Sequence, residues 1–155
     1  PEDFARFHPG GSLGRRLLTR VADVMHRERL PFCLPEASFR DVVHTITRGR
    51  LGLVLVGSPA HLSGIITDGD IRRTFERHAN PMALRATDIM SERPHSIAAT
   101  ERFAVAEELM REHRIHALVA LDAQERVCGV VQLLRNEPMV PWSAPAVDAV
   151  MADAA

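Results

Sequence analysis

The chain of 155 residues contains no lysine and no tyrosine, and it has only two cysteines, one tryptophan and six phenylalanines. All 19 basic residues are therefore arginine, and 20 acidic residues bring the net charge to −1. This balance excludes the overall basic character that is typical of nucleic-acid binding. No stretch approaches the roughly 20 apolar residues of a membrane span, and the N-terminus, with Glu2 and Asp3, does not resemble a signal peptide. We expect neither nucleic acid nor membrane as a partner.

The two cysteines, Cys33 and Cys128, stand alone, outside any Cys-x-x-Cys arrangement. Isolated cysteines of this kind behave as small core residues, and they are typical of the reducing cytoplasm. We expect a cytoplasmic protein with two free thiols. A bridge between Cys33 and Cys128 is the less favoured alternative.

What the sequence does contain is an internal repeat with a period of 65 residues, which predicts two similar structural units. The matching segments are Val24–Met25 with Ile89–Met90, Leu53–Val56 with Leu118–Leu121, and Gly64–Ile66 with Gly129–Val131. The match ends directly afterwards, where Thr67, Asp68, Gly69 and Asp70 face residues 132–135 of the second copy. Only one copy therefore carries the polar motif.

The hydrophobic pattern predicts the same order of elements in both copies, beginning with short turns at residues 21–26 and 86–90. Helices are expected at 39–46, with Ser38 as N-cap, at 67–78 and at 103–110, and strands at 51–56, 62–66, 118–121 and 127–131. Pro138, Pro141 and Pro145 interrupt any closing helix of the second copy. For the alanine-rich C-terminal end, residues 145–155, we predict either a weak helix or a disordered tail.

This order of elements resembles a tandem pair of CBS domains. Three segments carry the resemblance: Asp23-Val24-Met25, Asp88-Ile89-Met90 and Gly64–Asp70. The resemblance implies an α/β fold in which two β-α-β-β-α repeats pack through their sheets. The repeats would span 21–79 and 86–138, with a tail at 139–155. Since such pairs commonly self-associate, a homodimer is expected.

The N-terminal segment, residues 1–20, lies outside the repeat and is interpreted as the end of an upstream domain. The chain is therefore expected to be a fragment. Its segment His8–Arg15, followed by Val21–His26 and Thr67–Arg73, resembles the C-terminal half of arabinose-5-phosphate isomerases. That family interconverts ribulose 5-phosphate and arabinose 5-phosphate in a sugar-isomerase domain. The resemblance implies that His8 assists proton transfer at the active site of that missing domain, in a parent protein that is a dimer or tetramer.

The candidate ligand site lies at the Thr67-Asp68-Gly69-Asp70 segment, where a strand ends and a helix begins. Thr67 and Asp70 have the spacing of a capping box, and free amides at a helix start attract anions. By resemblance to nucleotide-binding CBS pairs, Thr67 would contact phosphate and Asp70 the ribose hydroxyls. Arg72 and Arg73 could neutralise a phosphate or a sugar-acid carboxylate, while His116 is expected to line the cleft between the copies opposite residues 51–53.

We therefore predict a regulatory module that senses a nucleotide or nucleotide sugar, such as the CMP-linked sugar acid to which the parent pathway leads. No cofactor is expected. A metal at Asp68 and Asp70 is disfavoured because a calcium loop needs six or more oxygen ligands, and His113 with His116 lacks a third ligand. In the second copy, Gln132 and Arg135 cannot replace Thr67 and Asp70.

Two other functions remain as alternatives. The pair could be a structural dimerisation module that positions His8 without sensing a ligand. An enzyme in its own right is the weakest hypothesis, because no nucleophile, base and orienting group can be assembled from these residues.

Overall fold

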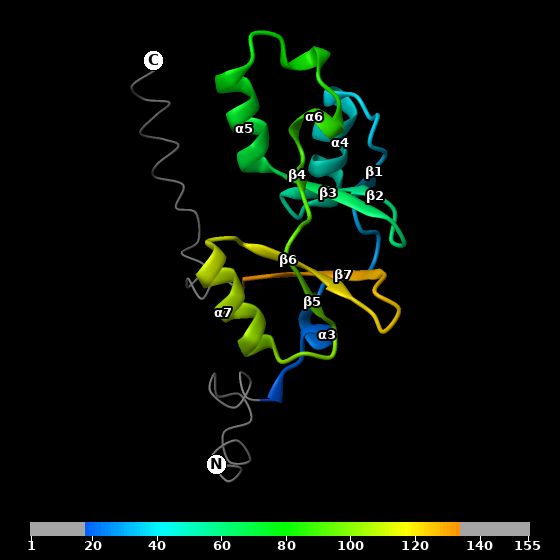
Figure 1. Ribbon diagram of the computed structural model, residues 1–155, viewed down its shortest axis with the longest axis vertical. Coiled ribbons are helices and arrows are strands. Elements are labelled where there is room, and N and C mark those ends of the chain that lie inside the picture. The colour runs from blue at the N-terminus through cyan, green and yellow to red at the C-terminus, as the bar shows by residue number, and fades with distance from the viewer. Residues whose placement is uncertain (1–17, 134–155) are drawn as a thin grey trace, which may run out of the picture.

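The computed structural model describes residues 18–133 of the chain, and within them it shows an α/β fold built from two similar halves (Figure 1). The first half contains α3 (Val21–Val24), β1 (Phe32–Cys33), α4 (Phe39–Gly49), β2 (Leu53–Gly57), β3 (Leu62–Thr67) and α5 (Asp68–Arg77). The 3-10 helix η1 (Pro81–Ala83) leads to the second half, which contains α6 (Ala86–Ile89), β4 (Ser91–Glu92), β5 (Ser96–Ala98), α7 (Phe103–His113), β6 (Ala117–Leu121) and β7 (Val127–Gln132). The expected helices and strands are confirmed to within a few residues.

The strands form two sheets, in the orders β1-β2-β3-β4 and β5-β6-β7. Equivalent strands keep equivalent registers, because Phe32 lies opposite Leu55 in the first sheet and Ile97 lies opposite Ala120 in the second. The strand β4 was not predicted: its two residues are exposed, so they carry no hydrophobic signal. It pairs with β3 and carries the chain from the first half to the second.

The helix α4 shows how directly the sequence specifies local structure. Ser38 caps it, with its hydroxyl oxygen accepting from the Asp41 amide at 3.2 Å, as predicted. Phe39, Val42 and Ile46 then fall on one face and are buried, because residues three and four apart share one side of a helix.

The two sheets face each other, and the helices cover their outer faces (Figure 1). Each half has its own core between helix and sheet. A third cluster, between the sheets, contains Leu53, Leu55, Val119, Val127 and Val130. The expectation that two repeats pack through their sheets is therefore confirmed.

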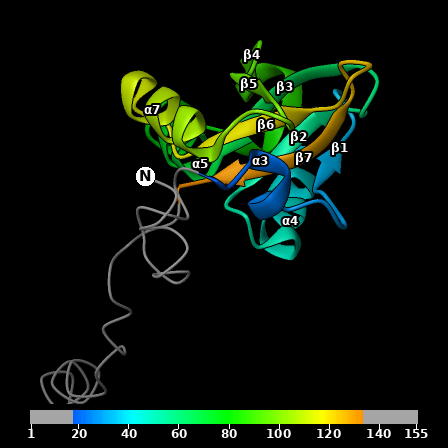
Figure 2. The ribbon, with the colours of Figure 1, turned by 90° about the horizontal axis from the view of Figure 1, so that it is seen from below.

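The opening turn of the first copy packs on the second copy rather than on its own (Figure 1; Figure 2 shows the same turn from below). In α3, the Val21 amide donates to the Glu101 carbonyl at 2.9 Å, and the Val21 side chain is fully buried in the core of the second half. Met25 follows and lies against Gly129 of β7, where an added Cβ would be 2.5 Å from the methionine sulfur. Only a glycine leaves room for this contact.

The opening turn of the second copy packs on the first copy in an equivalent way. The Ala86 amide of α6 donates to the Ala37 carbonyl at 2.9 Å, and Ala86 is buried in the core of the first half. Met90 lies against Gly64 of β3, where an added Cβ would be 2.7 Å from its sulfur. The two halves thus exchange their opening turns, and each turn completes the core of the other half.

Matching capping interactions hold both exchanged turns in place. The Arg20 amide donates to Asp23 Oδ2 and the Arg85 amide to Asp88 Oδ2, each at 2.8 Å. Both arginine side chains also cross to the other half, where Arg20 donates to the Thr100 carbonyl at 2.6 Å and Arg85 to that of Glu36 at 2.7 Å. A single interaction pattern therefore occurs twice, about 65 residues apart.

Several predictions fall on residues outside 18–133: His8, Arg135, the interrupted closing helix and the tail at 139–155. Cys33 and Cys128 are both free, and they pack against the cores of different halves. Among the described residues, no helix has both the length and the apolar character needed to cross a membrane.

Candidate ligand-binding site

A cavity of about 1130 Å³ lies between the two halves, and both halves contribute to its walls. The first half contributes residues 51–53 at the start of β2, Ile65 of β3, and residues between 67 and 73 at the start of α5. The crossing segment 91–95 and residues 114–117 and 132–133 of the second half complete the lining. Of the predicted ligand-binding residues, six line this cavity: Thr67, Asp68, Asp70, Arg72, Arg73 and His116.

At the start of α5, Thr67 and Asp70 bond to each other in both directions. The Thr67 amide donates to Asp70 Oδ2 at 2.9 Å, and the Asp70 amide donates to Thr67 Oγ1 at 3.3 Å. The threonine hydroxyl also lies 3.1 Å from Asp70 Oδ2, to which it can donate. The predicted capping box is therefore confirmed, and it fixes both polar side chains at the edge of the cavity.

Asp70 also forms an ion pair with Arg73, whose Nη2 donates to Oδ1 at 2.6 Å. Both carboxylate oxygens are thus engaged, one by Thr67 and the other by Arg73. Because each carboxylate oxygen can accept more than one hydrogen bond, Oδ1 can accept from a further donor beside the guanidinium. The guanidinium is half exposed, with 51% of its side chain accessible against 15% for Asp70, so it can turn toward a ligand at little steric cost.

Asp68 is positioned by the loop before β2. Its amide donates to the Gly52 carbonyl at 3.0 Å, and a Cβ on Gly52 would lie 3.1 Å from Asp68 Oδ2. Gly52 has a φ of +70°, a conformation that favours glycine. This glycine lets the loop run directly under the helix start, so that Leu51 to Leu53 form the floor of the cavity beside the Thr67–Asp70 pair.

The histidines do not form the helical pair that their spacing suggested. The helix α7 ends at His113, and His116 lies beyond it in the loop that leads to β6. The His113 ring instead stacks on His95, with centroids 4.1 Å apart and planes 21° apart. Within residues 18–133, no group of three or more His, Cys, Asp or Glu side chains is placed to hold a metal ion.

Gln132 occupies the position in the second half that Thr67 occupies in the first, but its side chain has a different role. Its Nε2 donates to the Leu51 carbonyl at 2.7 Å, across the boundary between the halves. The amide is therefore committed to holding the cavity floor of the first half. No Thr-x-x-Asp arrangement exists in the second half to match the first.

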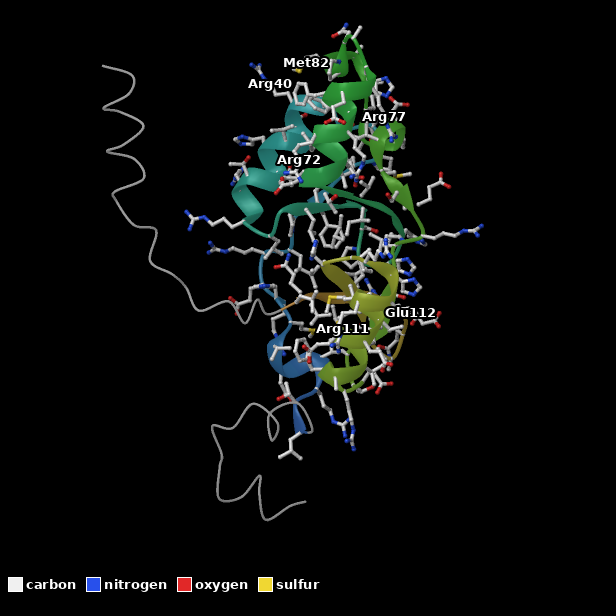
Figure 3. All side chains as sticks on the ribbon, turned by 90° about the vertical axis from the view of Figure 1, so that its left-hand side faces the viewer. Arg40, Arg72, Arg77, Met82, Arg111 and Glu112 are labelled. Carbon is white, nitrogen blue, oxygen red and sulfur yellow. The ribbon has the colours of Figure 1, made fainter. Side chains whose placement is uncertain are left out.

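Sequence reasoning missed Arg93, His95 and Arg114, which also line the cavity. They lie in loops without a motif or a periodic pattern, so no local signal marks them. They reach the cavity because β4 crosses between the halves and the loop after α7 turns inward. Figure 3 shows Arg72 projecting from α5 on the side nearer to the second half, closer to it than Arg77 lies.

Comparison with known families matches a model described as the CBS domain to residues 21–77 and 86–133. The chain belongs to the CBS domain family. Each matched stretch begins at one of the exchanged turns, at Val21 and Ala86, and ends beyond the strand that reaches the cavity.

Among characterised proteins, this CBS chain is similar to arabinose 5-phosphate isomerases. It is 43% identical to arabinose 5-phosphate isomerase KpsF of Escherichia coli over 134 residues, which are 86% of this chain and 41% of that protein. It is 44% identical to a probable arabinose 5-phosphate isomerase of Haemophilus influenzae, over 85% of this chain and 39% of that protein, and 39% identical to KdsD of Pseudomonas aeruginosa, over 85% and 41%. The chain spans about 40% of the length of these relatives.

Solved CBS structures share the fold at low sequence identity. The CBS domain of a bacterial CNNM/CorC family Mg²⁺ transporter in complex with ATP has a TM-score of 0.67 at 18% identity, covering 86% of this chain and 92% of that one. The CBS protein PAE2072 of Pyrobaculum aerophilum, complexed with AMP, has a TM-score of 0.66 at 19% identity, covering 86% and 98%.

Proposed function

We propose that this CBS pair is the ligand-sensing module of an arabinose 5-phosphate isomerase, and that it binds a nucleotide or nucleotide sugar in the cavity between its halves. The observation that carries the proposal is the Thr67–Asp70 pair, held at the cavity edge by mutual hydrogen bonds. Three findings support it: the isomerase relatives, and two solved structures of the same fold that contain ATP and AMP.

Each polar group at the start of α5 has a role in this proposal. The Thr67 hydroxyl and the amides of the first turn donate to a phosphate, which the helix dipole also favours. Asp70 accepts from the ribose hydroxyls through Oδ1, the carboxylate oxygen to which Arg73 donates. Arg73, once released, pairs with the phosphate, and Arg72 adds a second positive charge.

A ligand regulates the parent enzyme only if it binds two arrangements of the protein with unequal affinity. The cavity allows such unequal affinity because its walls come from both halves. A ligand that contacts both walls favours one relative position of the halves. The CMP-linked sugar acid at the end of the parent pathway is the proposed natural ligand. The proposal also includes the cytoplasmic location, a homodimer of this module, and a parent dimer or tetramer in which His8 serves the isomerase domain.

Thermal unfolding with and without ligand tests the proposal. The panel contains CMP, AMP, ATP, arabinose 5-phosphate and a CMP-linked sugar acid. A ligand at 100 times its Kd stabilises the folded state by about 2.7 kcal/mol, which raises Tm by about 5–10 °C for a chain of this size. We expect Asp70→Ala to abolish the shift.

Asp23→Ala is the matched control, since Asp23 caps α3 with the same bond but lies outside the cavity lining. Both variants lose about 1 kcal/mol of capping stability, but only Asp70→Ala should lose the ligand response. If no member of the panel raises Tm, the sensing function is wrong.

One observation favours the structural alternative, in which the module only joins subunits and positions His8. The second copy has replaced its ligand motif by Gln132, which ties the halves together. In that case the panel leaves Tm unchanged, while sedimentation still shows a dimer of this chain.

A further inference from the structure

Two arginines and two histidines line the cavity from the crossing segment and the second half. Arg93 and His95 come from the crossing segment, while Arg114 and His116 come from the loop between α7 and β6. Among the lining residues of these two segments, Glu92 is the single carboxylate. The half that lost the nucleotide motif thus contributes positive charge to the same cavity.

Neither Arg93 nor Arg114 has a carboxylate partner among residues 18–133. The ion pair on the cavity lining joins Arg73 to Asp70, on the opposite side. Unpaired guanidinium groups gathered at a concave surface attract anions, because the cavity concentrates their field. Their planar fork of donors matches the two oxygens of a carboxylate or phosphate.

The first half has counterparts of these two arginines. Arg93 (φ 53°) and Arg114 (φ 54°) have left-handed backbones, and so do Arg29 (φ 50°) and Arg50 (φ 57°), which precede them by 64 residues. Of these four arginines, only Arg93 and Arg114 line the cavity.

We infer that Arg93 and Arg114, flanked by His95 and His116, form a second anion subsite, which binds a carboxylate or a further phosphate at the far end of the ligand. This inference rests on the proposed function, in which the nucleotide end lies at Thr67 and Asp70. One ligand then spans both halves, with its nucleotide on the first and its distal anion on the second. The expected stoichiometry is one ligand per chain.

Isothermal titration calorimetry of the whole chain tests the inference with probes that differ in the distal anion. CMP and AMP carry none, CTP and ATP carry further phosphates, and CMP-N-acetylneuraminate carries a carboxylate. We expect Arg93→Gln and Arg114→Gln each to weaken the binding either of the triphosphates or of CMP-N-acetylneuraminate. The expected loss is about tenfold or more, the magnitude of a lost hydrogen bond to a charged group. The class affected identifies the anion as phosphate or carboxylate. Binding of CMP and AMP should change little.

Arg29→Gln and Arg50→Gln are the matched controls, because they remove the same charge from the same backbone conformation outside the cavity. Binding of every probe should remain within about twofold of wild type in both controls, since both side chains are exposed, neither lines the cavity, and salt screens exposed charges. Arg114→Lys should restore part of the lost affinity, since it restores the charge without the fork.

The outcomes separate the two proposals. If monophosphates bind at Asp70 but the longer probes bind no differently in the Arg93 and Arg114 variants, the second subsite is wrong and the proposed function stands. Equal losses in all four arginine variants also overturn the subsite, because they show only the effect of net charge. If no probe binds the wild-type chain, both proposals fail.

Discussion

Thr67 and Gln132 are equivalent residues, each at the end of the second antiparallel strand of its half. Thr67 bonds within its own half, to the Asp70 that follows it. Gln132 bonds across to the other half, at Leu51. The two halves therefore use the side chain at this shared position differently. Thr67 holds Asp70 at the proposed ligand site, and Gln132 joins the two halves beside the same cavity.

The exchanged turns show the opposite behaviour, since they are nearly identical in both halves. Met25 on Gly129 and Met90 on Gly64 repeat one contact, and the capping bonds of Asp23 and Asp88 repeat another. These contacts bury apolar groups or satisfy amides, and both halves need them equally. Packing thus preserves the symmetry of the duplication, whereas polar residues at the cavity differ.

The largest predicted effect comes from removing the space that the exchanged turns use. Gly64→Ala and Gly129→Ala should each lower the free energy of unfolding by about 1–3 kcal/mol, because the new methyl group overpacks against a methionine and a backbone carbonyl. Chemical denaturation measures the loss. Hydrogen exchange should place it in β2 and β3 for Gly64→Ala and in β6 and β7 for Gly129→Ala.

Adding Met90→Ala to Gly64→Ala separates the two clashes. The double variant removes the contact with the methionine sulfur but keeps the close approach to the Ser91 carbonyl, 2.8 Å from the added Cβ. Recovery should therefore be incomplete. Wild-type stability in either single glycine variant would contradict the exchange of turns.

A smaller effect tests the difference between Thr67 and Gln132 directly. Thr67→Val and Gln132→Leu should each cost about 1 kcal/mol, since each leaves a backbone group without its side-chain partner. Only Thr67→Val should also weaken the binding of a nucleoside monophosphate, measured by calorimetry. Equal weakening by both variants would mean that the ligand depends on the closure of the cavity and not on the threonine hydroxyl.

The smallest effect on stability concerns the two thiols, one packed on each half. Burial and the nearby Asp41 raise the pKa of Cys33 to about 11, and burial also raises the pKa of Cys128, partly offset by Arg27. Because the thiolate is the reactive form, both thiols should react slowly with a disulfide reagent at pH 8. Cys33 should be the slower of the two.

In urea the two thiols should react at equal rates, which provides the control. Above the unfolded pKa of about 8.5, the unfolded chain loses thiol protons that the folded chain keeps, so the free energy of unfolding falls as the pH rises. Fast labelling of Cys33 in the folded protein at pH 8 would contradict the raised pKa of its thiol.

Local sequence patterns predicted most of the helices, strands and helix caps of this molecule. The buried face of α4, its Ser38 cap, the paired strands and the capping box at Thr67 all depend on residues within a few positions of one another, and all are confirmed. The short strand β4 was missed because its two exposed residues carry no periodic signal. The spacing of His113 and His116 gave no sign of the partner that His113 has in the structure, which is His95, a residue 18 positions away.

The duplication, the order of elements and the place where the two copies differ all follow from the amino-acid sequence, because helix caps and amphipathic periodicity act over a few residues. That each opening turn completes the other half, and that Arg93 and Arg114 join Thr67 and Asp70 around one cavity, becomes visible once the chain is folded. Such contacts connect residues 20 or more positions apart, and they depend on how two sheets stack and where a crossing strand runs. No local pattern encodes that geometry. The repeat therefore located the Thr67–Asp70 segment, and the packing of the halves brought the residues of the second half to the same cavity.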